Sequence, residues 1–195
     1  MAKPIKFLIA AVVALVLGVG IGYVTASPLV DLIFVSKAVK NGPWMTNLDI
    51  GSQQAGPYLR AAIARHGLLA LTKSEAVYFS AYSDSDGQPL RGSCDYAIEC
   101  EDMDAEWWSI TVYGKDNFLI PNPQNIYSCN GNSLVRDADG MFRIHLSATP
   151  KEVNWLPSGN EESLSLTLRL YKAGNALLND PAAAQLPRIT KVKCQ

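Results

Sequence analysis

The sequence predicts a mainly β protein, an antiparallel β-sandwich of jelly-roll-like type, preceded by an N-terminal transmembrane helix and carrying one or two short helices. Three observations support this class. The N-terminus contains a long uncharged apolar run, the second half contains two long strand patterns, and Asp, Gly and Pro turns separate several shorter strands. The 195 residues carry a net charge of −1 and suffice for one domain with an appendage.

The apolar run extends from Phe7 to Ala26 and follows Lys3 and Lys6. At about 1.5 Å per residue, it matches a hydrocarbon core of roughly 30 Å. Two interpretations compete, a retained signal anchor or a signal peptide cleaved after Ala26. We favour the anchor, because the run exceeds the usual signal-peptide core of about 7–15 residues. The lysines then place the N-terminus in the cytoplasm.

The chain divides into three parts by pattern. Residues 1–27 form a cytoplasmic tip and anchor, 28–50 an amphipathic stalk and linker, and 51–195 the β-sandwich domain. In the stalk, Pro28 opens a new helix over Leu29 to Lys40, and Trp44 to Ile50 is a connector. Within the domain, a short helix is expected from Tyr58 to His66, ending at Gly67.

Two stretches, 107–113 and 164–171, have the strongest strand patterns, with β-branched, aromatic and alternating leucine residues. These two strands should lie in the sheets of one sandwich. Side chains alternate between faces, so each strand has an apolar face and a mixed polar face. Arginine and tyrosine on the mixed face suit a ligand site, because arginine offers a planar fork to a carboxylate or phosphate. With neighbouring loops, the candidate ligand-binding residues are Ser109, Thr111, Tyr113, Asn122, Asn154, Trp155, Arg169 and Tyr171.

The alternative interpretation is the ordinary solvated face of an antiparallel sheet, and the sequence alone favours it. In the same way, the asparagine of Asn154-Trp155-Leu156-Pro157 has a structural explanation, as a side chain that satisfies loop backbone while its neighbours pack.

Charged and titratable residues give no sign of catalysis or metal binding. The turns at 84–87 and 137–140 resemble part of a calcium loop but lack its full ligand set, so we interpret them as hairpin turns. The acidic stretch 99–106 is expected to be a solvated loop, and His66 and His145 have no partner at ligand spacing. No familiar catalytic motif occurs. We therefore expect no metal, no cofactor and, from the near-neutral charge, no nucleic-acid partner.

Several motifs occur in a specific order: EAVYF at 75–79, WWSIT at 107–111, NWLP at 154–157 and LRLY at 168–171. In this order they resemble the bacterial domain of unknown function 1214 family, and more narrowly its short members, in which a membrane segment precedes that domain alone. The resemblance covers roughly residues 50 to 194. It implies a β-sandwich in the cell envelope and no particular activity. The expected location is the inner membrane, single-pass, with the C-terminal domain in the periplasm; the alternative is a cleaved, soluble periplasmic protein.

The four cysteines lack the paired spacing of zinc sites, and their even number in an exported domain favours disulfides. Four cysteines allow three connectivities. In the short members of the family, the C-terminal cysteine recurs with the one that matches Cys94. The resemblance therefore implies Cys94–Cys194, which leaves Cys100–Cys129 as the second bridge.

Two functions remain as hypotheses. The first is a non-catalytic envelope module that binds a small ligand or an envelope protein or has a structural role, and the absence of catalytic motifs favours it. The alternative is an enzyme that acts on a small or saccharide-like ligand at the polar sheet face. The spacing of Gly18 and Gly22 would also suit a homodimer of membrane helices, although glycine is common in such helices in any case.

Overall fold

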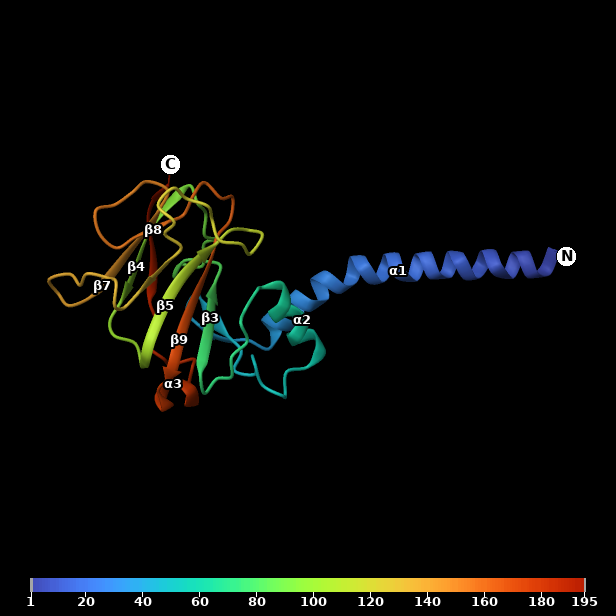
Figure 1. Cartoon of the computed structure of the whole chain (residues 1–195), viewed down its shortest axis with the longest axis horizontal. Coiled ribbons are helices and arrows are strands. Elements are labelled where there is room, and N and C mark those ends of the chain that lie inside the picture. The colour runs from blue at the N-terminus through green and yellow to red at the C-terminus, as the bar shows by residue number, and fades with distance from the viewer. Residues whose placement is uncertain (1, 195) are drawn as a thin grey trace.

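The protein consists of a long N-terminal helix and a domain of two packed β-sheets, seen here in a computed structural model that describes residues 2–194 (Figure 1). One sheet has six strands in the order β1-β2-β3-β9-β5-β6, and the other has four in the order β10-β4-β7-β8. The predicted mainly β fold with two sheets is confirmed. The strands are β1 (Val39–Asn41), β2 (Trp44–Thr46), β3 (Ala76–Ala81), β4 (Cys94–Cys100), β5 (Ala105–Tyr113), β6 (Ser128–Asn130), β7 (Phe142–Ser147), β8 (Trp155–Pro157), β9 (Ser165–Ala173) and β10 (Arg188–Cys194). The helices are α1 (Ala2–Ser36), α2 (Pro57–Arg65) and α3 (Asn175–Asn179).

The main core lies between the two sheets, and β5 and β9 form its centre. These strands pair antiparallel in the six-stranded sheet, with Ile110 opposite Leu168. Leu166, Leu168 and Leu170 are completely buried against residues of the four-stranded sheet such as Ile144. Burial of one such side chain contributes roughly 1.5–3 kcal/mol. The two strand patterns found in the sequence therefore belong to neighbouring strands of one sheet.

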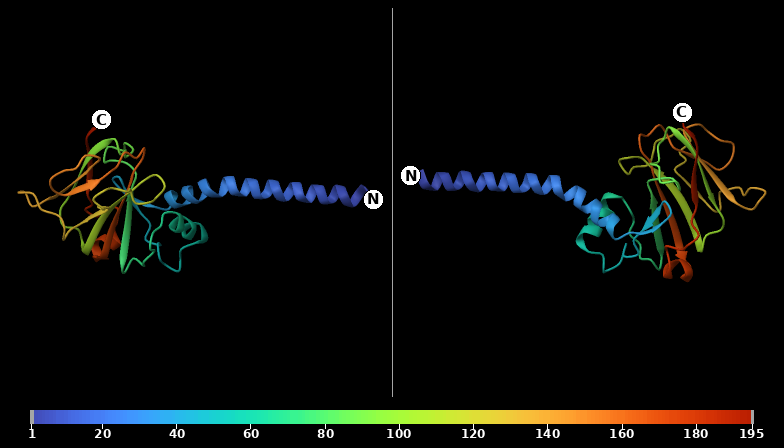
Figure 2. Two further views of the ribbon diagram at one scale, coloured as in Figure 1. Left: turned by 45° about the horizontal axis from the view of Figure 1, so that its top comes forward. Right: turned by 180° about the vertical axis from the view of Figure 1, so that it is seen from behind.

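Helix α1 continues through Pro28 and ends at Ser36, so the expected separate stalk helix is instead the end of the first helix. Pro28 removes one helical hydrogen bond, but the residues after it are held by packing. Val30 and Phe34 are buried in a second hydrophobic cluster with residues of α2 and the outer side of β3, including Tyr78. Figures 1 and 2 show α2 beside the base of α1.

The remainder of the expected stalk and connector forms the hairpin β1–β2, which the sequence pattern did not predict. Strand β2 pairs with β3, with Trp44 opposite Ala81. The Trp44 side chain is buried, and its indole N–H donates to the Pro187 carbonyl at 2.7 Å. Tertiary pairing therefore decides the structure of this segment, because strands of three residues carry little local signal.

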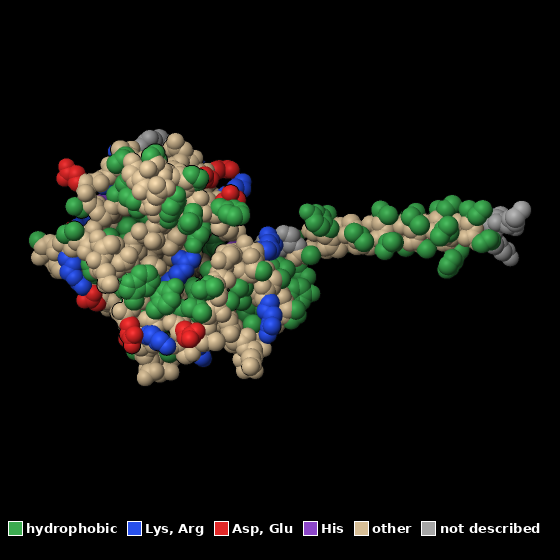
Figure 3. All heavy atoms as spheres, in the orientation of Figure 1, with side chains coloured by type: hydrophobic (Ala, Val, Ile, Leu, Met, Phe, Trp, Pro, Cys, Tyr) green, Lys and Arg blue, Asp and Glu red, His purple; other side chains and the backbone are tan. Residues whose placement is uncertain are grey.

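The N-terminal part of α1 projects away from the domain. The segment Pro4–Ser36 is long and apolar enough to cross a membrane, and none of its most apolar window is buried within the protein. Figure 3 shows hydrophobic side chains along the described part of the projecting helix. Length and composition of this kind fit a membrane anchor or a signal sequence.

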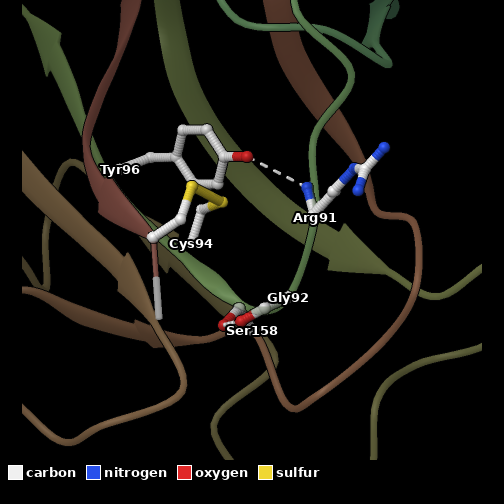
Figure 4. Close-up of a disulfide and its surroundings, with 6 residues drawn as sticks. Arg91, Gly92, Cys94, Tyr96 and Ser158 are labelled. Carbon is white, nitrogen blue, oxygen red and sulfur yellow. Dashed lines mark hydrogen bonds between the residues drawn. A yellow bond between two sulfur atoms is a disulfide. The ribbon is translucent and has the colours of Figure 1, made fainter.

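Strand β10 pairs with β4 at one edge of the four-stranded sheet, and Cys194 lies directly opposite Cys94. The two cysteines form a disulfide across a sequence separation of 100 residues, as the family resemblance implied. Figure 4 shows Tyr96 beside this bridge, where its hydroxyl accepts a hydrogen bond from the Arg91 amide at 3.0 Å. The end of the chain is therefore covalently joined to the strand that follows the Arg91 turn.

The predicted second bridge is wrong, because Cys100 and Cys129 are free and buried. Cys100 lies opposite Phe142 of β7. Cys129 instead contacts the Trp155 carbonyl, and Trp155 pairs with His145 of β7. The β7 residues next to the two cysteines, Phe142 and His145, are about 10 Å apart along the strand. A disulfide needs Cα atoms within about 7 Å, so Cys100 and Cys129 lie too far apart to form one.

We expect that replacing both Cys94 and Cys194 with alanine lowers the free energy of unfolding by about 2–5 kcal/mol, because the unfolded chain regains the entropy of a long open loop. Chemical unfolding of the full chain in detergent, followed by circular dichroism, measures this loss. Cys129→Ala is the control that removes a thiol without removing a cross-link. Equal stability of the double variant and the parent protein would contradict the structural role of the bridge.

The free thiols should resist alkylation in the folded protein. Burial raises the pKa of Cys100 from 9.0 to about 12 and that of Cys129 to about 11. Between pH 9 and about 11 only the unfolded chain ionises these thiols, so folding stability falls as pH rises through this window. Iodoacetamide labelling at about pH 9, read by peptide mass spectrometry, should modify both cysteines only after unfolding. Failure to label them in unfolded, unreduced protein would show that they are bridged after all.

Candidate functional site

The outer face of the six-stranded sheet, opposite the main core, has two different halves. Over β3, the second hydrophobic cluster covers the sheet with α2 and the end of α1. Over β9 and β5 the outward side chains are mainly polar and aromatic. We call this half the Arg169 surface; its residues are Trp107, Ser109, Thr111, Tyr113, Thr167, Arg169 and Tyr171. Figure 3 shows a basic side chain over β5 and β9 with hydrophobic side chains around it.

The Arg169 guanidinium is held in place by two hydroxyl groups of β5. Its Nη1 donates to Thr111 Oγ1 at 2.9 Å, and its Nη2 donates to Tyr113 Oη at 2.6 Å. The guanidinium carbon lies 5.7 Å from the centre of the Tyr113 ring. Both contacts come from the register of the two strands, since Arg169 is opposite Ser109 and one step from Thr111 on the same face. The fork is therefore oriented before any ligand binds.

The positive charge of Arg169 has no carboxylate partner among the ion pairs of residues 2–194. Its side chain is half-buried. An arginine in this state keeps N–H donors for a carboxylate or a phosphate, which guanidinium groups bind through two parallel hydrogen bonds. The arrangement is thus suited to an anionic group that approaches from solvent.

Aromatic rings border the Arg169 surface. Trp107 and Tyr171 face each other across the strand pair, with ring centroids 5.2 Å apart in an edge-to-face arrangement. Trp107 is 36% exposed. A flat ligand body, such as a sugar ring, would pack on such aromatic side chains while its acidic group reaches Arg169. Trp107 was placed on this face by its strand position but was not among the predicted site residues.

Tyr78 connects the two halves of the outer face. It lies opposite Arg169 in the β3–β9 pairing and accepts a hydrogen bond from the Leu71 amide at 3.3 Å. Burial raises the pKa of Tyr78, and the charge of Arg169 opposes this shift. Tyr78 therefore remains a neutral hydroxyl that anchors the segment after α2 beside the Arg169 surface.

Three predicted site residues lie elsewhere and have structural contacts. The Asn122 side chain exchanges hydrogen bonds with Ile126 in the β5–β6 loop. Asn154 does the same with Val135, through both its amide nitrogen and its oxygen. Trp155 belongs to β8 in the other sheet, and its indole donates to the Ser147 carbonyl at 3.0 Å. The structural explanation of the Asn-Trp-Leu-Pro motif therefore holds for these side chains.

Several acidic residues of the domain form ion pairs with an arginine or line a hollow away from the Arg169 surface. The turn at 137–140 places Asp137 and Asp139 against Arg143, which also bonds Glu99 at 2.8 Å. A hollow of about 490 Å³ beside α3 is lined by Asp102, Asp104 and Asp180 among others. Within residues 2–194, no three acidic, cysteine or histidine side chains are grouped to hold a metal ion. The Arg169 surface is thus the best-organised candidate for ligand binding.

Comparison with known proteins relates the domain to a protein family and to two solved structures. A family described as protein of unknown function (DUF1214) matches residues 75–175, which run from β3 to β9 and contain the whole Arg169 surface. The crystal structure of the VPA0106 protein from Vibrio parahaemolyticus is 32% identical, with a TM-score of 0.58 over 72% of this chain and 36% of that one. A structure of an uncharacterised protein from Burkholderia cenocepacia is 18% identical, with a TM-score of 0.43 over 62% of this chain and 30% of that one.

This chain spans about a third of the length of the two solved proteins. No curated protein matches it. The family match covers more than half of the sequence and agrees with the motifs between residues 75 and 171. This chain is accordingly a member of the DUF1214 family.

Proposed function

We propose that the protein is a membrane-anchored, non-catalytic binding module of the bacterial cell envelope, and that the Arg169 surface binds an anionic group of a small ligand. The observation that carries this proposal is the orientation of the Arg169 fork by Thr111 and Tyr113, without a carboxylate partner among the described ion pairs. Maintaining such a cation at a half-buried position is useful when an external anion completes its hydrogen bonds.

The anchoring half of the proposal is supported by α1. Its most apolar window is not buried within the protein, and Lys6 precedes the uncharged stretch that begins at Phe7. The positive-inside rule then directs the domain to the opposite side of the membrane. The Cys94–Cys194 disulfide supports the same side, because such bridges persist in the oxidising periplasm and are rare in the cytosol.

The ligand half of the proposal follows from the chemistry of the surface. Arg169 suits a carboxylate or phosphate, and the hydroxyl of the half-buried Tyr113 suits a polar substituent next to it. Trp107 and Tyr171 suit a flat ring. Small acidic saccharides and phosphorylated metabolites combine these features, so they are the first compounds to test.

We expect the full chain to remain in the membrane after an alkaline carbonate wash, with an intact mass that includes residues 1–26. Protease added to spheroplasts should digest the domain while a tag at the N-terminus stays protected. A mature chain that starts at Ser27 would instead identify a cleaved signal peptide, and protection of the domain would reverse the topology. Cleavage would leave Val30 and Phe34 on the domain.

We expect an acidic saccharide or phosphorylated compound to raise the melting temperature of the full chain in nanodiscs. A ligand at 100 times its Kd stabilises the folded state by about 2.7 kcal/mol, which corresponds to roughly 5–10 °C for a domain of this size. Arg169→Lys keeps the charge but loses the planar fork, so it should abolish most of the shift. Differential scanning fluorimetry measures both effects.

Arg91→Ala is the matched control, because Arg91 is an exposed arginine in the turn before β4. It should leave the ligand shift unchanged. Ligand shifts that survive Arg169→Lys and Arg169→Ala in folded protein would move the binding site away from this surface. Conversion of a bound compound into a product would show that the module is an enzyme.

A further inference from the structure

A hollow of about 390 Å³ lies at the base of α1, apart from the Arg169 surface. Four segments line it: the end of α1, the end of α2, the residue that follows β3 and the loop between β5 and β6. The lining residues are Phe34, Val35, Arg65, His66, Tyr82, Lys115 and Asn117. Its polar lining is basic or neutral, and no carboxylate lines it among the side chains that the structure describes. The charge of the lining therefore favours an anion.

The hollow lies at the height of the lipid headgroups when α1 spans a membrane. The uncharged stretch from Phe7 to Val30 extends for about 36 Å as a helix, slightly more than the hydrocarbon core. Phe34 is one turn further, about 6 Å beyond the end of this stretch. The headgroup layer on each side of a bilayer is roughly 5–8 Å thick. The opening of the hollow is thus within reach of phosphate groups in that leaflet.

The net charge differs between the two parts of the chain in the direction that favours binding to an anionic membrane surface through the part next to α1. Residues 28–74, which include α2 and the base of α1, carry five basic and two acidic residues, a net charge of +3. Residues 75–195 carry a net charge of −6, from ten basic and sixteen acidic residues. An anionic leaflet therefore attracts the part of the domain next to α1 and repels the rest. Figures 1 and 2 show α2 and its flanking loops on the side from which α1 leaves.

Exposed apolar side chains accompany these basic residues. Leu69, in the loop after α2, is 74% exposed, and Tyr58 at the start of α2 is 46% exposed. Leu32 on α1 is also exposed. Apolar and basic residues in one region are typical of segments that lie in the membrane interface, where the apolar groups enter the acyl boundary and the cations meet the phosphates.

We propose that this hollow binds the phosphate headgroup of an anionic phospholipid, with Arg65 and Lys115 as its cationic contacts and Leu69 in the adjoining interface. Lys115 pairs with Glu162 at 3.1 Å, but both side chains are highly exposed, and such pairs contribute little. A bound lipid would join α1, α2 and the β5–β6 loop, and so set the orientation of the Arg169 surface relative to the membrane. The assignment rests on the membrane anchoring proposed above.

The test is lipid binding to the full chain in mild detergent, measured by native mass spectrometry with phosphatidylglycerol and phosphatidylcholine. Phosphatidylglycerol should bind more tightly. In the double variant Arg65→Gln and Lys115→Gln its affinity should fall by roughly 10- to 30-fold, as expected for two lost surface cations. The matched control is Lys191→Gln with Lys193→Gln, which removes two exposed lysines of β10.

Three outcomes would overturn the headgroup assignment. They are equal binding of the two lipids, an equal loss in both double variants, and stabilisation of lipid-free protein by inorganic phosphate to the extent that phosphatidylglycerol stabilises it. The last outcome would identify a site for free phosphate. Failure of anchoring is recognised separately, because the chain would then leave the membrane in the carbonate wash while its lipid preference could still be measured.

A second measurement locates the interface without touching the basic residues. Leu69→Trp in vesicles containing brominated phosphatidylglycerol should show fluorescence that the bromine quenches. Val135→Trp is the control, since Val135 is also exposed and belongs to the β6–β7 loop, on the side of the domain far from α1 (Figure 1). Equal quenching at the two positions would overturn the proposed orientation of the domain.

Discussion

The antiparallel register of β5 and β9 is the constraint on which most of this structure depends. It places Ile110 opposite Leu168 and Trp108 opposite Leu170, so that one face of the pair is continuous apolar surface. This face forms the centre of the main core. Because side chains alternate in a strand, the same register directs Arg169, Thr111 and Tyr113 to the other face. The packing of the core and the geometry of the candidate site are therefore two results of one pairing.

The outer face shows how the long N-terminal helix is connected to the domain. Val30 and Phe34 come after Pro28, yet they remain helical and pack with α2 over the outer side of β3. Tyr78 belongs to this cluster and is also the neighbour of Arg169 in the sheet. Helix α1 is thus in direct contact with the domain, and the Arg169 surface begins where this contact ends. The position of this surface relative to α1 follows from packing and needs no flexible linker.

The opposite sheet is stabilised by different means. Strand β10 is an edge strand with a mostly exposed face, so it gains less from burial than the central strands do. The Cys94–Cys194 bridge compensates by tying the end of β10 to the start of β4. Ion pairs add to this sheet near Arg143, where the turn at 137–140 and Glu99 meet. The carboxylates of this turn, which resemble part of a calcium loop in sequence, therefore form ion pairs with an arginine.

The sequence by itself determined the features that are encoded locally. Uninterrupted apolar residues indicated the long N-terminal helix, and alternation in 107–113 and 164–171 indicated two strands with an apolar and a polar face. The polar face correctly grouped Ser109, Thr111, Tyr113, Arg169 and Tyr171, because strand periodicity assigns faces without knowledge of partners. Family motifs supplied the Cys94–Cys194 pairing, which spacing alone left open.

Only the tertiary structure decided which distant segments meet. The hairpin β1–β2, the separation of Cys100 from Cys129, and the structural use of Asn122 and Asn154 all depend on contacts between residues far apart in the chain or on the exact path of a loop. The hollow at the base of α1 is of the same kind, since Phe34, Arg65 and Lys115 come from three separate segments. Local patterns specify which way a side chain faces, whereas strand pairing and helix packing specify what it faces.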